Sequence, residues 1–317
     1  TYMLTLTSDV NDYFVQCTIF ISLMQYGLFS GLFEASCLRL KCQRAQVSKT
    51  RRSSGFSQNR RYLSMTYCVA IKVRDGIVAL ADCRLTSGTQ VTVGRKITLH
   101  GQNHRFFIAT SGLRSLRDKT LSYLDREIEA LDSDNFPTML DAVEAFAGQM
   151  RQVARADMEF LEESNLKFNI HALVGGRLAE DTESHVFLVY PEGNWIEVGE
   201  RTPYQVIGET PYGKPVLDRA LDYDTPLSTA LKLAYLSFDS TRASASDVGF
   251  PIDLMTFTNA DETWREAQYI DDDVRAQRFW WNDNITRIAR EMPDGPWVDD
   301  LLAAPLWVVD GNKPDAS

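Results

Sequence analysis

The sequence has few cysteines, no cysteine pair at metal-binding spacing and no excess of positive charge. Its five cysteines among 317 residues are too few and too irregular for a disulfide framework, and none forms a C-x-x-C pair. This cysteine usage fits a reducing compartment. The formal net charge of −10 argues against a general nucleic-acid binder.

Sequence signals for cofactors and for several enzyme classes are also missing. No phosphate-binding glycine loop, dinucleotide fingerprint or serine or cysteine nucleophile elbow occurs. The four histidines have no metal-ligand spacing, and a structural role is the better interpretation of each. They are His100, His104, His171 and His185. The sequence therefore predicts neither a metal ion nor a cofactor.

What the chain does have is a marked change of composition near residue 65. Residues 1–64 hold eight bases and three acids, a net charge of +5, whereas the remainder holds 25 bases and 40 acids, a net charge of −15. We interpret 1–65 as a non-native, upstream or removable extension that is disordered. Residues 66–300 are expected to form one domain, and 301–317 a C-terminal tail.

The extension contains an uncharged run from Tyr13 to Phe33, which is long enough to span a bilayer. Polar residues dilute the run, no basic segment precedes it and no A-x-A-like site follows it, so a secretory signal is a poor interpretation. A membrane contact is expected only if residues 13–33 are retained in the mature protein. A membrane anchor and a pro-segment or targeting arm remain alternatives.

The body of the chain predicts runs of strands alternating with runs of helices, which favours an α+β fold over a parallel βαβ sheet. Tyr67–Val73 and Ile77–Ala81 read as a hairpin through an Asp-Gly turn. Helices are predicted at 113–131, 139–163, 214–221, 226–238 and 272–291. Further strands are predicted at 96–100, 105–110, 170–174, 186–190, 195–198, 205–208, 252–256 and 264–269.

Thr66 follows Met65, and removal of an initiator methionine before a small residue would leave Thr66 at the N-terminus. Its hydroxyl is then a nucleophile, and its α-amine, with a pKa of about 7.7–8.0 in peptides, is a general base near neutral pH. The alternative is an ordinary strand residue.

Three later residues could support such a nucleophile. Asp82 ends the second strand and Lys96 begins a later one, so an Asp–Lys pair there would stabilise an anion and hold the pKa of the amine down. A surface ion pair is the alternative. Gly112 lies at a strand-to-helix junction, where bare backbone N–H groups can hold an oxyanion. A simple turn glycine is the alternative.

The order of these residues resembles the proteasome β-type family of N-terminal-nucleophile hydrolases. Asp82 follows Thr66 by sixteen residues and Gly112 follows it by forty-six, as in that family. The opening MTYCVAI and the stretch SFDSTRASASDVGFPIDLMTF are similar to the bacterial Anbu, or ancestral β-subunit, subfamily. Lys96 lies two residues earlier than usual, so the intervening loop at Leu85–Gly94 would be shorter. The resemblance covers about Met65 to Trp297.

The resemblance implies a four-layer αββα sandwich, a cytoplasmic location and self-assembly into a ring or helical array. It also implies hydrolysis of peptides or amides through an ester on Thr66. Separate partner enzymes could supply the substrate, since the chain contains no ATPase module. The late helix with Phe279, Trp280, Trp281, Ile285 and Ile288 is interpreted as a subunit interface.

The residues that correspond to the family's supporting groups beside the amine are harder to assign. Asp239 and Ser244 are the first candidates, with Asp247 and Ser246 as rivals, because Val248-Gly249 replaces the family's Gly-Gly. Capping of a helix end is the alternative for all four. Where the family has a serine after an Ile-Gly turn, this chain has Glu209.

These departures keep two other functions open. One is a scaffold with the proteasome fold and little hydrolytic activity. The other is a specific amide hydrolase, in which Leu85, Thr110 and Arg114 would line the pocket as the resemblance implies and Arg114 would favour an acidic substrate side chain.

Overall fold

Two antiparallel five-stranded sheets form the centre of the described part of the chain. The computed structural model describes residues 66–87, 90–102, 105–131 and 136–302. All of them belong to one unit, Asn59–Ser317. Sheet one has the order β10 (Tyr204–Gly208), β1 (Tyr67–Val73), β2 (Gly76–Asp82), β11 (Ile252–Thr258), β12 (Thr263–Tyr269). Sheet two has the order β5 (Ile97–His100), β6 (Phe106–Ser111), β7 (His171–Gly176), β8 (His185–Val189), β9 (Trp195–Glu197).

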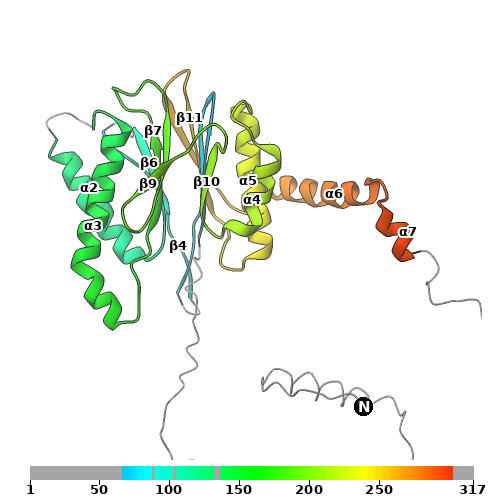
Figure 1. Ribbon diagram of the computed structural model, residues 1–317, viewed down its shortest axis with the longest axis horizontal. Coiled ribbons are helices and arrows are strands. Elements are labelled where there is room, and N and C mark those ends of the chain that lie inside the picture. Colours follow the sequence, from blue (N-terminus) through cyan, green and yellow to red (C-terminus); the bar gives the residue numbers. More distant parts are fainter. Residues whose placement is uncertain (1–65, 88–89, 103–104, 132–135, 303–317) are drawn as a thin grey trace, which may run out of the picture. The chain divides into compact units, whose positions relative to one another are not determined.

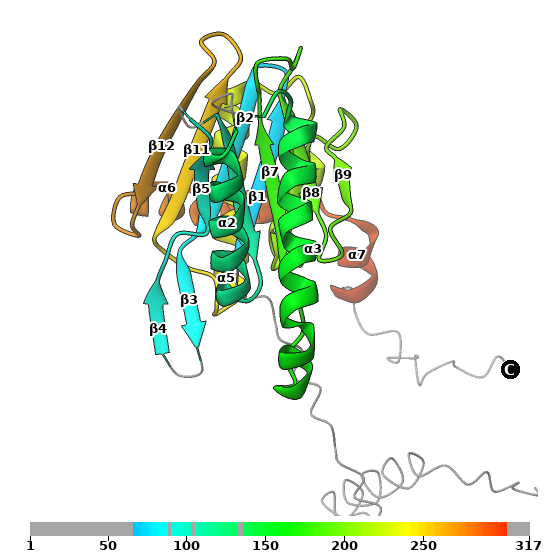
Figure 2. The ribbon, with the colours of Figure 1, turned by 90° about the vertical axis from the view of Figure 1, so that its left-hand side faces the viewer.

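Helices cover the outer face of each sheet, which makes four layers (Figure 1). The helices α2 (Arg114–Glu129) and α3 (Met139–Glu163) pack on sheet two, as Figure 2 also shows. The helices α4 (Thr210–Ala220) and α5 (Leu227–Ser244) pack on sheet one. The αββα sandwich expected from the sequence is confirmed.

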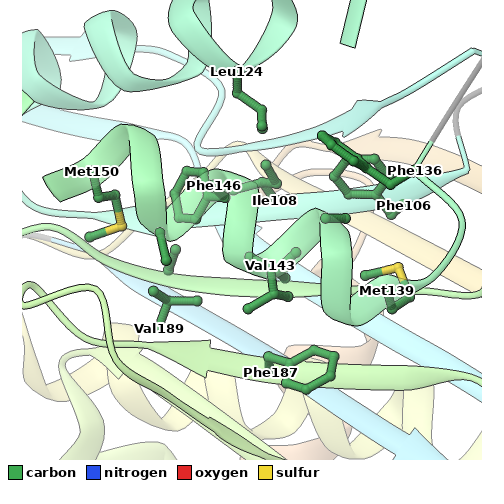
Figure 3. Packing of buried hydrophobic residues seen from close by; sticks show 14 of the residues in the cluster. Phe106, Ile108, Leu124, Phe136, Met139, Val143, Phe146, Met150, Phe187 and Val189 are labelled. Atoms are coloured by element: carbon green, nitrogen blue, oxygen red, sulfur yellow. The ribbon is translucent and has the colours of Figure 1, made fainter. Parts of the chain in front are cut away.

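Three apolar clusters hold these layers together. One lies between the two sheets and includes Cys68, Phe107 and Phe257. A second joins sheet one to α4 and α5. The third joins sheet two to α2 and α3, and Figure 3 shows Val143 and Phe146 of α3 in it with Ile108 of β6. Since β1 and β2 are covered on both faces, every residue in them is buried, and their sequences read as continuous apolar runs.

Local sequence explains where the main elements begin. Thr138 caps α3: its hydroxyl accepts from the Asp141 N–H, and the Asp141 carboxylate accepts from the Thr138 N–H, each at 3.2 Å. Gly76 follows the Arg74-Asp75 turn with φ 153°, and a Cβ there would lie 1.9 Å from the Phe257 oxygen. Only glycine therefore allows β11 to pair with β2 at that point.

Two segments differ from their sequence predictions. The presumed loop at Leu85–Gly94 is a two-stranded ribbon, β3 (Arg84–Ser87) paired with β4 (Gln90–Val93). All four residues of β4 are exposed, so the ribbon has no buried face to impose an apolar–polar alternation. In addition, α7 (Pro296–Leu302) crosses the predicted boundary between domain and tail at residue 300. The rest of the domain division stays a prediction, because 1–65 and 303–317 lie outside the described residues.

Candidate active site

Thr66 lies at the end of sheet one, directly before β1, and is 6% exposed. In the neighbouring strand β10, Gly208 pairs with Tyr67, so Glu209 follows opposite Thr66. The Glu209 N–H donates to the Thr66 carbonyl oxygen at 2.8 Å. Thr66 and the residue after it are thus held by pairing with β10, so the position of Thr66 is set by the sheet.

Asp82 and Lys96 form a buried ion pair beside this residue. The Lys96 Nζ lies 2.8 Å from Asp82 Oδ1, with side chains 2% and 0% exposed. The same carboxylate oxygen accepts from the Tyr67 N–H at 2.8 Å, which ties the pair to the residue after Thr66. Burial raises the pKa of Asp82, while the Lys96 ammonium and the Tyr67 N–H oppose that rise. The alternative of a surface pair is excluded by the burial.

The pair joins the two sheets. Asp82 ends β2 in sheet one, whereas Lys96 directly precedes β5 in sheet two. The Thr110 N–H donates to the Lys96 oxygen at 2.9 Å, which continues the pairing of β5 with β6. The ammonium is therefore presented at the end of the inter-sheet core, next to the start of β1.

Gly112 occupies the junction between β6 and α2 with φ 123°. A Cβ there would lie 2.7 Å from the Asn169 oxygen. The Asn169 side-chain oxygen also accepts from the Leu113 N–H at 3.1 Å, which fixes the start of α2. The junction therefore has no room for a side chain at position 112, although Gly112 itself is exposed to solvent. Such an exposed backbone before a helix N-terminus suits an oxyanion.

Asp239 and its rival Asp247 lie in different surroundings. Asp239 is buried in α5, and its Oδ1 accepts from the Arg242 Nη2 at 2.6 Å. Ser244 is exposed at the last residue of the same helix. Asp247 acts instead on Glu209: burial first, and then the Asp247 charge, raises the pKa of Glu209. Asp247 therefore influences Glu209, the residue whose N–H donates to the Thr66 oxygen.

Arg84 and Thr86 are further candidate site residues, which sequence reasoning missed. The Arg84 Nε and the Thr86 Oγ1 are buried, and neither has a hydrogen-bond partner among the described residues. They lie two residues apart on β3, hence on one face of it. A Cβ on Gly249 would lie 3.5 Å from the Arg84 Nη1, so this guanidinium lies beside the 247–249 segment. The alternation Asp82, Arg84, Thr86 was the available signal.

A second buried carboxylate contacts the sequence neighbours of the ion pair. Asp253 on β11 accepts from the Cys83 thiol at 3.0 Å and from the Gln268 amide at 2.9 Å. Its other contact is the Arg95 guanidinium at 3.6 Å. Cys83 follows Asp82 and Arg95 precedes Lys96, so this network fixes the chain on both sides of the pair. Burial raises the pKa of the Cys83 thiol.

Of the three residues that the resemblance placed in a substrate pocket, Leu85 and Arg114 both lie beside Gly94. A Cβ on Gly94 would contact Leu85 Cδ1 and would lie 3.9 Å from the Arg114 Nη1. The Arg114 Nε lies 3.3 Å from Asp118, and both side chains are exposed. Thr110 has a buried hydroxyl without a partner among the described residues. The Thr110 N–H donates to the Lys96 oxygen, so Thr110 lies at the end of β6 nearest Lys96.

The histidines, possible metal sites and possible membrane spans were also compared with the structure. In the described ranges, no three or more His, Cys, Asp or Glu side chains are placed to hold a metal ion. His100 is hydrogen-bonded to Thr98 and Asp125, which agrees with a structural role; His104 lies outside the described residues. None of the described helices is both long and apolar enough to cross a bilayer. The run Tyr13 to Phe33 lies outside the part that the structure describes.

The comparisons with known proteins agree with this geometry. Residues 65–256, more than half of the chain, match the family described as proteasome subunit. The chain belongs to the proteasome subunit family. Solved Anbu structures place it in the Anbu branch of that family, as the sequence resemblance suggested. No match was found among curated proteins.

Three solved Anbu structures resemble the chain over its body. The Anbu complex from Pseudomonas aeruginosa, described as a helical assembly, is 30% identical, with a TM-score of 0.67 over 73% of this chain and 98% of that one. Anbu from Hyphomicrobium sp. strain MC1 is 30% identical, with a TM-score of 0.64 over 73% and 99%. Anbu (ancestral beta-subunit) from Yersinia bercovieri is 29% identical, with a TM-score of 0.64 over 73% and 99%.

Proposed function

We propose that this Anbu-branch chain is a threonine hydrolase of peptide or amide bonds, with Thr66 as its N-terminal nucleophile once Met65 and the preceding residues are gone. The observation that carries the proposal is the buried Asp82–Lys96 pair, hydrogen-bonded to the backbone directly after Thr66. A charged pair buried at a strand end is costly, and a role in binding a developing anion explains its presence there.

In the proposed reaction the Thr66 hydroxyl oxygen attacks the substrate carbonyl carbon while the Thr66 amine takes the hydroxyl proton. The Gly112 N–H stabilises the oxyanion, and Lys96, held by Asp82, stabilises the developing charge at Thr66. Collapse breaks the carbon–nitrogen bond, and the ammonium returns its proton to the leaving amine. Water then adds to the ester, the amine accepts its proton, and the acid leaves as the threonine hydroxyl is restored.

For the groups that support the amine, we propose Asp247 with Glu209 in preference to Asp239 with Ser244. Glu209 is bound to Thr66 through the backbone, and Asp247 lies close enough to affect its pKa. Asp239, by contrast, is already engaged by Arg242. Ser246 keeps its place as the neighbouring rival. Asp247→Asn should therefore slow turnover more than Asp239→Asn.

The test uses protein whose N-terminus has been sequenced as Thr66, with a panel of fluorogenic peptides carrying acidic, basic or apolar residues at the cleaved position. Thr66→Ala should lower kcat/KM by at least about 10³-fold without unfolding the protein. Thr66→Ser, which keeps a hydroxyl and an amine, is the matched control and should retain measurable turnover. Full activity in Thr66→Ala would refute the mechanism.

The same peptide panel tests a narrower substrate. The Arg114 guanidinium near Gly94 favours an acidic side chain at the cleaved position, and Asp118 offsets part of its charge. Faster cleavage after acidic residues, lost in Arg114→Gln, would support a specific hydrolase. Equal rates across the panel would count against it.

A scaffold with little activity is the second candidate function, favoured by Glu209 in the place of the family's serine and by the Asp239–Arg242 pair. A chain proven to begin at Thr66 that never reacts with a threonine-directed electrophile would support it. In either case we propose that copies of the chain assemble with one another in a ring or helical array, by analogy with the helical assembly of the Pseudomonas aeruginosa complex. A cytoplasmic location and separate partner enzymes stay predictions.

A further inference from the structure

Asn169 packs against the glycine that carries the proposed oxyanion donor. A Cβ on Gly112 would lie 2.7 Å from the Asn169 carbonyl oxygen and 3.0 Å from its side-chain oxygen. The side-chain oxygen accepts from the N–H of Leu113, the next residue along the chain, at 3.1 Å. Asn169 therefore contacts the junction between β6 and α2 with both its backbone and its side chain.

The backbone of Asn169 is itself held in place. It lies just before β7, in which His171 pairs with Ser111, the last residue of β6. The Asn169 carbonyl oxygen accepts from the His171 Nδ1–H at 3.3 Å, and Ile170 between them is fully buried. Because strand pairing in sheet two carries Asn169 to this place, it is a fixed neighbour of Gly112.

Strand geometry shows on which side of Gly112 this contact lies. β6 runs between β5 and β7, and the Thr110 N–H donates to the Lys96 oxygen on the β5 side. Because the N–H groups of successive residues point to opposite sides of a strand, the Gly112 N–H points to the same side as that of Thr110. Asn169 lies on the other side, next to β7. The contact therefore supports Gly112 on one side while its N–H faces the side of Lys96.

The hydrogen bond to Leu113 decides how the Asn169 amide is turned. A backbone N–H can donate only to the side-chain oxygen, so that oxygen must face Leu113. A carboxylate has nearly the same shape and would accept the same bond. It would also add a negative charge at the N-terminus of α2, where such a charge is favourable, and beside the proposed oxyanion, where it is not. Asparagine supplies the acceptor without the charge.

We propose that Asn169 is a positioning residue of the oxyanion site, which holds Gly112 from the β7 side through a neutral hydrogen-bond acceptor. This inference rests on the proposed function, since it takes the Gly112 N–H as the donor to the oxyanion formed at Thr66. Asn169 acts through the backbone of Gly112 and Leu113, and it keeps negative charge away from the place where the oxyanion develops.

The central variant is Asn169→Asp, measured with the fluorogenic peptide panel on chains that begin at Thr66. The carboxylate keeps the bond to Leu113 and favours the start of α2, so the urea midpoint should stay the same or rise. The same charge opposes the oxyanion, which exists only beyond the bound substrate, so kcat should fall by about 10- to 100-fold with KM unchanged. A purely structural role predicts no fall in kcat, because the hydrogen bond and the fold are retained.

Two further variants and a bound probe complete the test. Asn169→Ala removes the acceptor from Leu113 and should lower both kcat and the urea midpoint. Asn282→Asp places the same charge at an exposed position of α6 (Arg275–Glu291) and should change neither. A peptide boronate forms a negatively charged tetrahedral adduct when its boron accepts the threonine hydroxyl oxygen. Its affinity for Asn169→Asp should fall in proportion to kcat.

The outcomes separate this inference from the function on which it rests. Full kcat in Asn169→Asp, in a protein that Thr66→Ala inactivates, would overturn the role of Asn169 and leave the proposed function standing. So would a loss of urea midpoint in Asn169→Asp as large as that in Asn169→Ala, because the fall in kcat would then follow from a damaged junction. Equal activity of the wild type and Thr66→Ala, or a wild type that neither cleaves the peptides nor binds the boronate, would refute both.

Discussion

The Thr66 site and the last two described helices differ in how far they are buried. These helices are α6 (Arg275–Glu291) and α7 (Pro296–Leu302), together called the α6–α7 arm. At the site, a buried carboxylate lies 2.8 Å from a buried ammonium, and pairing of β1 with β10 holds the residue after Thr66. On the arm, apolar side chains along two helices have no buried member. The Asp82–Lys96 pair is therefore held by contacts within the chain, whereas the side chains of α6 and α7 stay exposed among the described residues. Substitutions in the two regions should differ in kind.

The largest effect is expected at the buried ion pair. Lys96→Met leaves the Asp82 carboxylate buried without its ammonium and should lower the free energy of unfolding by about 3–5 kcal/mol. Urea unfolding measures the loss. Lys119→Met removes the partly exposed Lys119–Asp157 pair and should cost at most about 1 kcal/mol. Equal losses in the two variants would remove the distinction between a buried pair at the site and an ordinary one.

The next effect is expected at Gly112. A methyl group there meets the Asn169 oxygen and a φ of 123°, so Gly112→Ala should destabilise the fold by about 1–3 kcal/mol. The displaced N–H should lower kcat by about 10²–10³-fold if it serves as the oxyanion donor. Gly148→Ala, at a helix position with open space around it, is the control. Unchanged kcat in Gly112→Ala would remove this glycine from the proposed mechanism.

Substitutions on the arm should leave the fold almost untouched. Ile288→Ser is expected to change the free energy of unfolding of the isolated chain by no more than about 0.5 kcal/mol, because the side chain is already in water. Thermal or urea unfolding at a concentration below assembly measures this. A loss of several kcal/mol would show that the arm packs on its own chain. The contrast between the exposed arm and the buried Thr66 site would then be wrong.

The smallest effect is a change in pH dependence at Glu209. Burial and the Asp247 charge raise the pKa of Glu209, so the native state holds this proton more tightly than the unfolded chain. The group's contribution to stability is therefore full below its unfolded pKa of about 4.3 and falls as pH rises through the folded pKa. Glu209→Gln should make stability less sensitive to pH across that window. If the urea midpoint depends on pH in the same way in Glu209→Gln and in the wild type, the pKa of Glu209 is not perturbed.

The fold could be predicted well where burial imposes a pattern. The runs at β1 and β2 are apolar because both faces are covered, and the helical period of α3 follows from its one buried face. The β3–β4 ribbon has no such constraint, since β4 is wholly exposed, and the sequence prediction made it a loop. The late aromatic helix was predicted close to its observed bounds. That none of its residues is buried could be seen only in the structure.

Some residues of the candidate site could be predicted from the sequence, and others required the structure. Thr66, Asp82, Lys96 and Gly112 were predicted from their order along the chain, and the structure brings Asp82 and Lys96 into contact beside Thr66. The choice between Asp239 and Asp247 depends on how the end of α5 turns, which spacing alone does not give. Arg84 was missed because the alternation Asp82, Arg84, Thr86 does not show that the Arg84 Nε is buried without a partner among the described residues, which only the structure reveals. The catalytic roles of all these residues stay predictions.

The most direct test of the proposed chemistry is to find where an electrophile attaches. The protein is produced from its native gene, its N-terminus is sequenced, and it is incubated with a reagent that bonds to both the hydroxyl and the amine of an N-terminal threonine. We predict a chain that begins at Thr66 and gains one reagent mass, located at Thr66 by peptide mapping, with no gain in Thr66→Ala. A mature chain that retains the residues before Thr66, and so has an amide nitrogen in place of the amine, would contradict the proposal.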